Sequence, residues 1–201
     1  MTQDRFVVIR HAEANNDWAV RQLFGELHNL NASFDHRFAL ADGWERVLSE
    51  HLNHVRETGY GMTLLAWHKE TPVGLIMMGV HSDSRLFRHR HWAELLAIYV
   101  VPAFRGGPIA DQLLAAGTAW AHERGYERIQ LYVTASNRRA KRFYEQAGFR
   151  PVQEIWRMDL GEAEAIPPDD LAGEVAYAHR HDLLSPSSHH LLIDEDAEDD
   201  Q

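Results

Sequence analysis

The feature that most constrains the fold is a strand, a small-residue turn and a helix that follow one another between Glu94 and Gly125. The apolar run Leu95–Val101 is typical of a buried strand, and a helical pattern runs from Pro108 to the residue before Gly125. The turn between them reads Arg105-Gly106-Gly107-Pro108-Ile109-Ala110. Such a turn presents free backbone N–H groups and the positive end of a helix dipole. Taken alone, it fits a phosphate-binding turn and a helix entry without a ligand equally well.

The rest of the pattern favours one mixed α/β domain. Strands are expected at Phe6–Ile9, Met62–Trp67, Val73–Val80, Trp92–Val101, Arg128–Val133 and Val152–Leu160. Helices are expected at Asp17–Leu30, from a cap at Asp42 to Gly59, at Pro108–Arg124 and at Asn137–Ala147. A hairpin followed by strand–helix–strand predicts a mixed, mostly antiparallel sheet flanked by helices.

Charge divides the chain at about residue 160. The net charge of −10 comes from residues 161–201, which carry net −11, whereas residues 1–160 carry net +1. We therefore expect a domain over 1–160 and an acidic C-terminal extension over 161–201. A near-neutral domain disfavours nucleic acid as a partner.

Composition excludes several kinds of chemistry. The chain has no cysteine, which rules out disulfides, cysteine-ligated zinc and a thiolate nucleophile. His89 and His91 lie beside arginines in Arg88-His-Arg-His91, and nearby positive charge disfavours a cation, so we expect no metal site. No apolar run is long enough to span a bilayer and no signal peptide is visible, so we expect a cytoplasmic protein that binds no membrane.

A second motif lies near the end of the expected domain. The segment Asn137-Arg-Arg-Ala-Lys-Arg-Phe143-Tyr144-Glu-Gln-Ala-Gly148-Phe149 places a phenol on a helix just before a glycine. Asn137 is a good helix cap, and the ring of Tyr144 is equally suited to packing with its hydroxyl at the surface. Together with the turn, this segment resembles the GNAT superfamily of N-acetyltransferases over roughly Glu94–Leu160; the preceding part agrees only in the order of its elements.

The resemblance implies a GNAT-like fold and acetyl-CoA as co-substrate, without a metal. The family pattern Gln/Arg-x-x-Gly-x-Gly/Ala, which grips the pyrophosphate, aligns with Arg105, Gly106, Gly107, Pro108, Ile109 and Ala110. Pro108 departs from that pattern, because proline has no N–H to donate. The strand positions that match the family's pantetheine-binding backbone are Ile98, Tyr99 and Val100. Asn137, one of the positions that match the family, is expected at the cofactor site.

The resemblance also implies the catalytic groups. Tyr144 matches the tyrosine that donates a proton to the departing thiolate of coenzyme A, and a phenol with a pKa of about 10 suits that role. Glu94 is the candidate base, although a water chain is an alternative and Glu94 can equally be a solvated residue at a strand end. The expected reaction is acetyl transfer to the primary amine of a small molecule or peptide.

Other readings stay open at this point. A non-catalytic acyl-CoA-binding or regulatory domain is the main alternative, and Pro108 is the residue that favours it. A third reading is an interaction protein that works through its acidic extension. A homodimer is possible, and the first two helices and the segment His81–His91, which would select the acceptor, do not reveal its identity.

Overall fold

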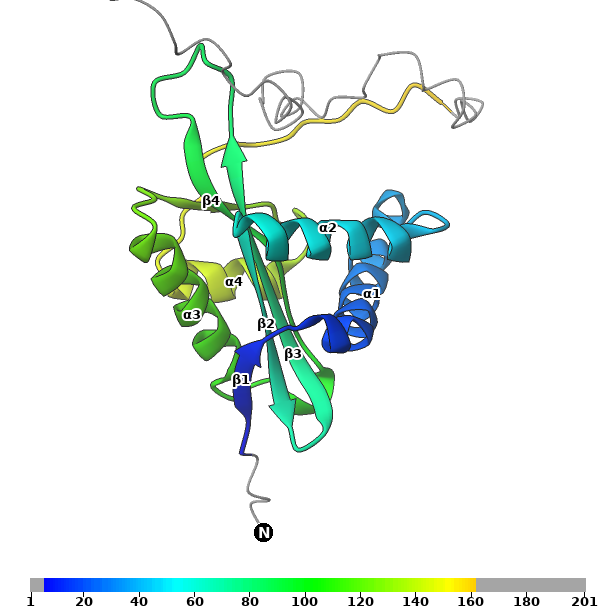
Figure 1. Ribbon diagram of the computed structural model, residues 1–201. Helices are drawn as coiled ribbons and strands as arrows, with labels where there is room; N and C mark the ends of the chain where they lie inside the picture. The colour runs from blue at the N-terminus through cyan, green and yellow to red at the C-terminus, as the bar shows by residue number, and fades with distance from the viewer. Residues whose placement is uncertain (1–5, 162–201) are drawn as a thin grey trace, which may run out of the picture. The chain divides into compact units, whose positions relative to one another are not determined.

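The computed structural model describes residues 6–161 (Figure 1). The expected acidic extension therefore lies outside the described residues from position 162 onward. The chain divides into two compact units. Among the described residues, one is built from Phe6–Val80 together with Trp92–Phe149, and the other from His81–His91 together with Arg150–Gly161. The first unit holds every helix among the described residues, and it holds all the candidate site residues.

The strands are β1 (Val8–His11), β2 (Gly61–His68), β3 (Thr71–Ser82), β4 (His91–Val100) and β5 (Ile129–Leu131). They form one sheet in the order β1-β2-β3-β4-β5, in which β1–β2 and β2–β3 pair antiparallel and β4–β5 pair parallel. The α-helices are α1 (Asp17–Phe34), α2 (Trp44–Thr58), α3 (Ile109–Glu123) and α4 (Arg138–Gln146), with short 3-10 turns η1 (Ala14–Asn16), η2 (His36–Phe38) and η3 (Pro102–Phe104). The expected mixed sheet flanked by helices is confirmed.

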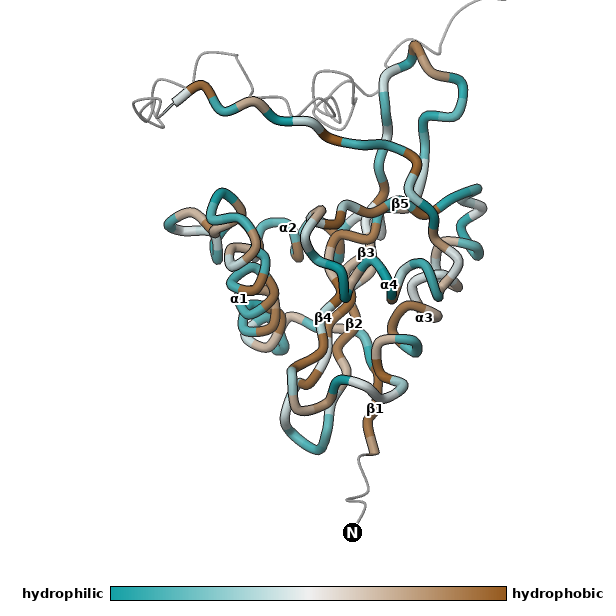
Figure 2. Tube along the Cα trace, turned by 180° about the vertical axis from the view of Figure 1, so that it is seen from behind, coloured by the Kyte–Doolittle hydropathy of each residue, from teal (hydrophilic) through white to brown (hydrophobic). Residues whose placement is uncertain are grey.

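Each face of the sheet is covered by two helices, and the two apolar layers are distinct (Figures 1 and 2). What we call the α1/α2 core joins those helices to the sheet through Ala19, Val20, Leu23, Leu48, Leu52, Leu65, Trp67, Leu75, Met77, Ala97 and Tyr99. The α3/α4 core joins the other face to α3 through residues such as Met62, Leu64, Val73, Ile76, Leu95, Val100, Ile109 and Leu113, and Phe143 and Tyr144 of α4 pack against it. Alternating side chains along a strand thus pack into opposite cores.

Two expectations about the elements are wrong. The helix α2 begins at Trp44 and is preceded by Gly43 in the left-handed region at φ 77°, so Asp42 is not its cap. Residues 151–160 have no regular secondary structure, although a last strand was expected there. The large apolar side chains between Val152 and Leu160 are 75–91% exposed. An alternating pattern gives a strand its faces, but the backbone still needs a partner strand.

None of the helices within residues 6–161 combines the length and the apolar character needed to cross a membrane.

Candidate active site

The turn after β4 has the geometry of an anion site. Gly106 lies in the left-handed region at φ 80°, where a side chain would be strained, and the turn then enters α3. Pro108 directly precedes the helix, and its carbonyl accepts the first helical hydrogen bond from the N–H of Gln112 at 2.9 Å. Proline therefore sits one position earlier than expected from the sequence, at the cap position.

The backbone N–H groups of this turn are available. Within the described chain, we find no acceptor for the N–H groups of Gly106, Gly107, Ile109 and Ala110. The last two belong to the first turn of α3, where N–H groups have no partner within the helix. These groups, together with the helix dipole, favour an anion at this place. Pro108 is the one member of the turn that has no N–H to offer.

Strand β4 changes face in its middle. Ala93 and Leu95 belong to the α3/α4 core, whereas Ala97 and Tyr99 belong to the α1/α2 core. In a regular strand, side chains two residues apart point to the same face. One extra residue must therefore be inserted at Leu96, which is the mark of a β-bulge. The sheet has a similar irregularity in β3, where Val73 and Leu75 face opposite cores at the place where the β2–β3 register shifts.

Beyond this bulge β4 also loses its neighbour. The pairing of β4 with β5 covers Ala93, Glu94 and Leu95 and ends there, opposite Leu131, the last residue of β5. The following residues, Leu96–Val100, continue as strand without a partner in β5. The sequence-predicted positions Ile98, Tyr99 and Val100 all lie in this stretch. An extended group can add to such an edge as a further strand, through backbone hydrogen bonds.

Tyr144 lies on the α3/α4 side of the sheet. Asn137 caps α4 by accepting a hydrogen bond from the N–H of Ala140 at 3.0 Å, and the helix closes with the N–H of Phe149 on the carbonyl of Tyr144 at 2.9 Å. The tyrosine ring meets the ring of Phe149 edge-on at 5.7 Å and packs against the α3/α4 core. Burial raises the pKa of Tyr144 to about 12, so the phenol keeps its proton at neutral pH.

Glu94 is placed differently. It is half-buried in the paired part of β4, opposite Gln130 of β5. Because Ala93 and Leu95 face α3, the side chain between them faces the α1/α2 side. The structure thus puts the two predicted catalytic side chains, Glu94 and Tyr144, on opposite faces of the sheet.

One cluster at this site was not anticipated. Tyr99 is only 8% exposed, and the Glu26 carboxylate of α1 and the Arg105 guanidinium both lie close enough to its hydroxyl to act on its pKa, in opposite directions. Arg105 also lies over the Tyr99 ring, 5.3 Å from its centroid, and its Nε donates to the carbonyl of Val100 at 2.7 Å. Burial and the Glu26 carboxylate raise the pKa of Tyr99. No signal in the sequence links Glu26 to a strand more than seventy residues away.

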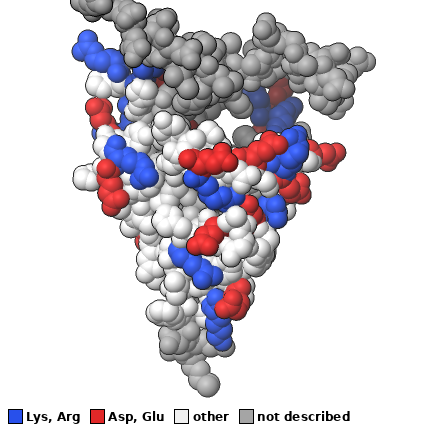
Figure 3. All heavy atoms as spheres, in the orientation of Figure 1, with Lys and Arg blue, Asp and Glu red and all other residues white. Residues whose placement is uncertain are grey.

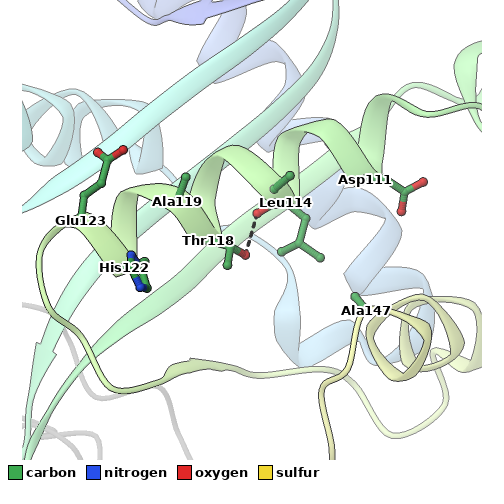
Figure 4. A pocket seen from close by; sticks show the side chains of 8 residues that line it. Asp111, Leu114, Thr118, Ala119, His122, Glu123 and Ala147 are labelled. Carbon is green, nitrogen blue, oxygen red and sulfur yellow. Dashed lines mark hydrogen bonds between the residues drawn. The ribbon is translucent and has the colours of Figure 1, made fainter.

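A shallow hollow runs along α3, from its first turn to its end (Figure 4). Its lining is Asp111, Leu114, Ala115, Thr118, Ala119, His122 and Glu123, with Ala147 after α4. The lining includes neither Tyr144 nor any residue of the turn, so we assign it no part in the chemistry. Within the described residues, no three His, Asp or Glu side chains gather where they would hold a metal ion. The face seen in Figure 3 carries basic and acidic side chains intermixed.

The comparisons with known proteins agree with this geometry. Residues 23–149 match the family model described as "Acetyltransferase (GNAT) family". Over 143 residues the chain is 31% identical to the aminoalkylphosphonate N-acetyltransferase of Salmonella typhimurium, which covers 71% of this chain and 84% of that one. It is 35% identical over 77 residues to the mycothiol acetyltransferase of Streptosporangium roseum, but this spans only 23% of that protein and 38% of this chain.

Solved structures share the fold. Aminoglycoside acetyltransferase AAC(6')-Iy, in complex with a bisubstrate analogue of coenzyme A, superposes with a TM-score of 0.62 at 17% identity, over 77% of this chain and 97% of that one. An aminoglycoside acetyltransferase from a soil metagenomic sample gives a TM-score of 0.57 at 17% identity, over 80% and 99%. At these identities the likeness concerns the fold. The family model and the Salmonella relative carry the assignment: the chain belongs to the GNAT family and is an acetyl-CoA-dependent N-acetyltransferase.

Proposed function

We propose that this protein moves the acetyl group of acetyl-CoA directly to the primary amine of a small molecule. The observation that carries the proposal is the behaviour of β4, which bulges at Leu96, leaves β5 after Leu95 and then runs into the turn at Arg105–Ala110. One strand thus leads from an open backbone edge to an anion site. That is the order in which the pantetheine arm and the pyrophosphate of coenzyme A follow one another.

The cofactor is proposed to bind mainly through backbone groups. The pyrophosphate lies against the N–H groups of Gly106, Gly107, Ile109 and Ala110, and the arm lies along Ile98–Val100. A hydrogen bond to a charged group contributes about 1.5–3 kcal/mol. The first turn of α3 also carries Asp111, an acidic side chain that works against an anion there. The N–H groups and the dipole must therefore supply the affinity.

Tyr144 is proposed as the acid that protonates the departing thiolate. A phenol whose pKa is raised to about 12 is fully protonated at neutral pH, which is the state that an acid needs. A phenol of this pKa is a weaker acid than a thiol with a pKa of about 8.5, so proton transfer to the thiolate is uphill and must be coupled to cleavage of the C–S bond. Glu94 is the candidate base from the α1/α2 side, and a water chain is the alternative route for the amine proton.

The acceptor is proposed to be a small amine that approaches from the α1/α2 side of the sheet. This leaves the α3/α4 side to Tyr144 and the cofactor. The Salmonella relative is named for an aminoalkylphosphonate, and two structural neighbours are named for aminoglycosides. These two chemical classes are the first to test.

The test is a thiol-release assay with acetyl-CoA against aminoalkylphosphonates, aminoglycosides, amino acids and polyamines. The N-acetylated form of each amine is the matched blank, and product mass identifies the acetylated nitrogen. Tyr144→Phe tests the acid, with Tyr60→Phe as control, because Tyr60 is a half-exposed phenol that directly precedes β2. Amine-dependent release that is lost only in Tyr144→Phe supports the proposal. Acetyl-CoA binding without release from any amine supports a non-catalytic acyl-CoA-binding domain, the reading that Pro108 favours.

A further inference from the structure

The side chain of Arg105 is committed to the protein rather than pointed freely at a ligand. Its Nε donates to the carbonyl of Val100 at 2.7 Å, and its guanidinium lies over the ring of Tyr99, 5.3 Å from the ring centroid. An arginine that donates to its own strand and stacks on an aromatic ring is held in one orientation. Arg105 therefore fixes the start of the phosphate turn to the end of β4.

Tyr99 also reaches the opposite layer of the molecule. Its ring packs in the α1/α2 core, and the carboxylate of Glu26 in α1 lies close enough to its hydroxyl to raise the pKa of the phenol. Glu26 in turn accepts a hydrogen bond from Gln22, one turn earlier in the helix, at 3.1 Å. A continuous set of polar contacts thus runs from α1, through a buried phenol, to the turn. Because Tyr99 is buried, removing either partner leaves polar groups poorly satisfied.

We infer that Tyr99 is a positioning residue that couples α1, on the acceptor side of the sheet, to the cofactor turn. In this arrangement Glu26 orients the phenol, the phenol orients Arg105, and Arg105 sets the turn whose N–H groups meet the phosphates. Coenzyme A binding then favours the orientation of α1 that the Glu26–Tyr99 contact selects, and the coupling is reciprocal. The inference rests on the proposed cofactor site.

A double-mutant cycle on coenzyme A affinity, measured by calorimetry, tests the coupling. Glu26 lies on α1, so Glu26→Ala changes no residue of the turn. It should nevertheless weaken coenzyme A binding by about 5-fold or more. In a Tyr99→Phe background, which keeps the ring and its stacking on Arg105, the same change should have no further effect. Glu26→Gln retains an oxygen that accepts from the phenol, so it should recover most of the affinity.

Controls separate this coupling from general effects. Glu50→Ala removes a carboxylate of α2 that is 61% exposed and pairs with Arg46 at 2.6 Å. It should leave coenzyme A affinity unchanged. Melting temperatures establish that each variant is folded. As a second readout, coenzyme A should slow amide hydrogen exchange in Gln22–Leu30 of the wild type, and Tyr99→Phe should abolish that protection.

The outcomes are distinguishable. If the wild type does not bind coenzyme A, the proposed cofactor site and this inference both fall. If the wild type binds it but Glu26→Ala has no effect, or has the same effect in both backgrounds, only the coupling is overturned. A loss of amine turnover in Glu26→Ala with coenzyme A affinity intact would instead assign Glu26 to the acceptor itself and refute the positioning role.

Discussion

Replacing Tyr144 with phenylalanine separates its chemistry from its packing. The ring meets Phe149 and the α3/α4 core, and phenylalanine keeps both contacts. The described residues offer no hydrogen-bond partner for the Tyr144 hydroxyl, so its loss should leave the free energy of unfolding at pH 7 almost unchanged. If the phenol is the acid, the turnover number should nevertheless fall by about 10²- to 10⁴-fold.

The raised pKa gives the same variant a second, independent signature. The folded pKa of about 12 lies above the value of about 10 for an unfolded tyrosine. The unfolded chain therefore loses this proton first, and the stability linked to Tyr144 is intact below pH 10 and is lost as the pH rises from 10 to 12. A shift of two pKa units corresponds to at most about 2.7 kcal/mol, and partial solvent access reduces that figure.

The assay is urea unfolding of both proteins, followed by tryptophan fluorescence, at pH 8, 9, 10 and 11. The difference in unfolding free energy between wild type and Tyr144→Phe should be flat up to pH 9 and should then move in favour of the variant. Other ionisable groups titrate in both proteins and cancel in the difference. If the difference in unfolding free energy stays flat over the whole pH range, the burial argument is refuted. If Tyr144→Phe keeps full amine turnover, Tyr144 has a packing role and is not the acid.

Four further substitutions test the site and its scaffold. Pro108→Gly restores an N–H to the turn and should tighten coenzyme A binding by up to about 10- to 100-fold; unchanged or weaker affinity would mean that the phosphates avoid this position. Arg105→Lys keeps the charge but loses the fixed fork, so coenzyme A affinity should fall, whereas a simple charge contact would retain it. Gly61→Ala should lower the unfolding free energy by about 1–3 kcal/mol, because its Cβ would lie 2.7 Å from the carbonyl oxygen of Met78; Gly25→Ala, with Trp44 at 3.5 Å, should raise it by about 0.5–1 kcal/mol.

The parts of the fold that carry local signals were predictable. Expected and observed bounds of α3 and α4 agree within a residue, because Pro108 and Gly125 delimit one helix while Asn137 and Gly148 delimit the other. The mixed sheet followed from the order of its strands. The segment 152–160 had the right alternation but is not a strand here, since pairing depends on a distant partner.

The candidate site was only partly visible in the sequence. The turn and Tyr144 stand in a recognisable order, and both keep a suitable environment in the structure. The bulge at Leu96 could not be read from a run of good strand formers, because it appears only when side chains are assigned to two cores. No local sequence pattern singles out Glu26, and its proposed role depends on its proximity to Tyr99, which only tertiary packing creates.

The bulge in β4 explains how one strand can serve two substrates. Without it, Leu95, Ala97 and Tyr99 would all face α3, and the phenol of Tyr99 could not reach Glu26. The face change also sends Ile98 and Val100 toward the core that holds Tyr144. The loss of pairing after Leu95 opens the backbone edge between these two sets of side chains. A donor held along that edge has the acid on one side and the acceptor-side helix on the other, which is the geometry that direct transfer without a covalent enzyme intermediate requires.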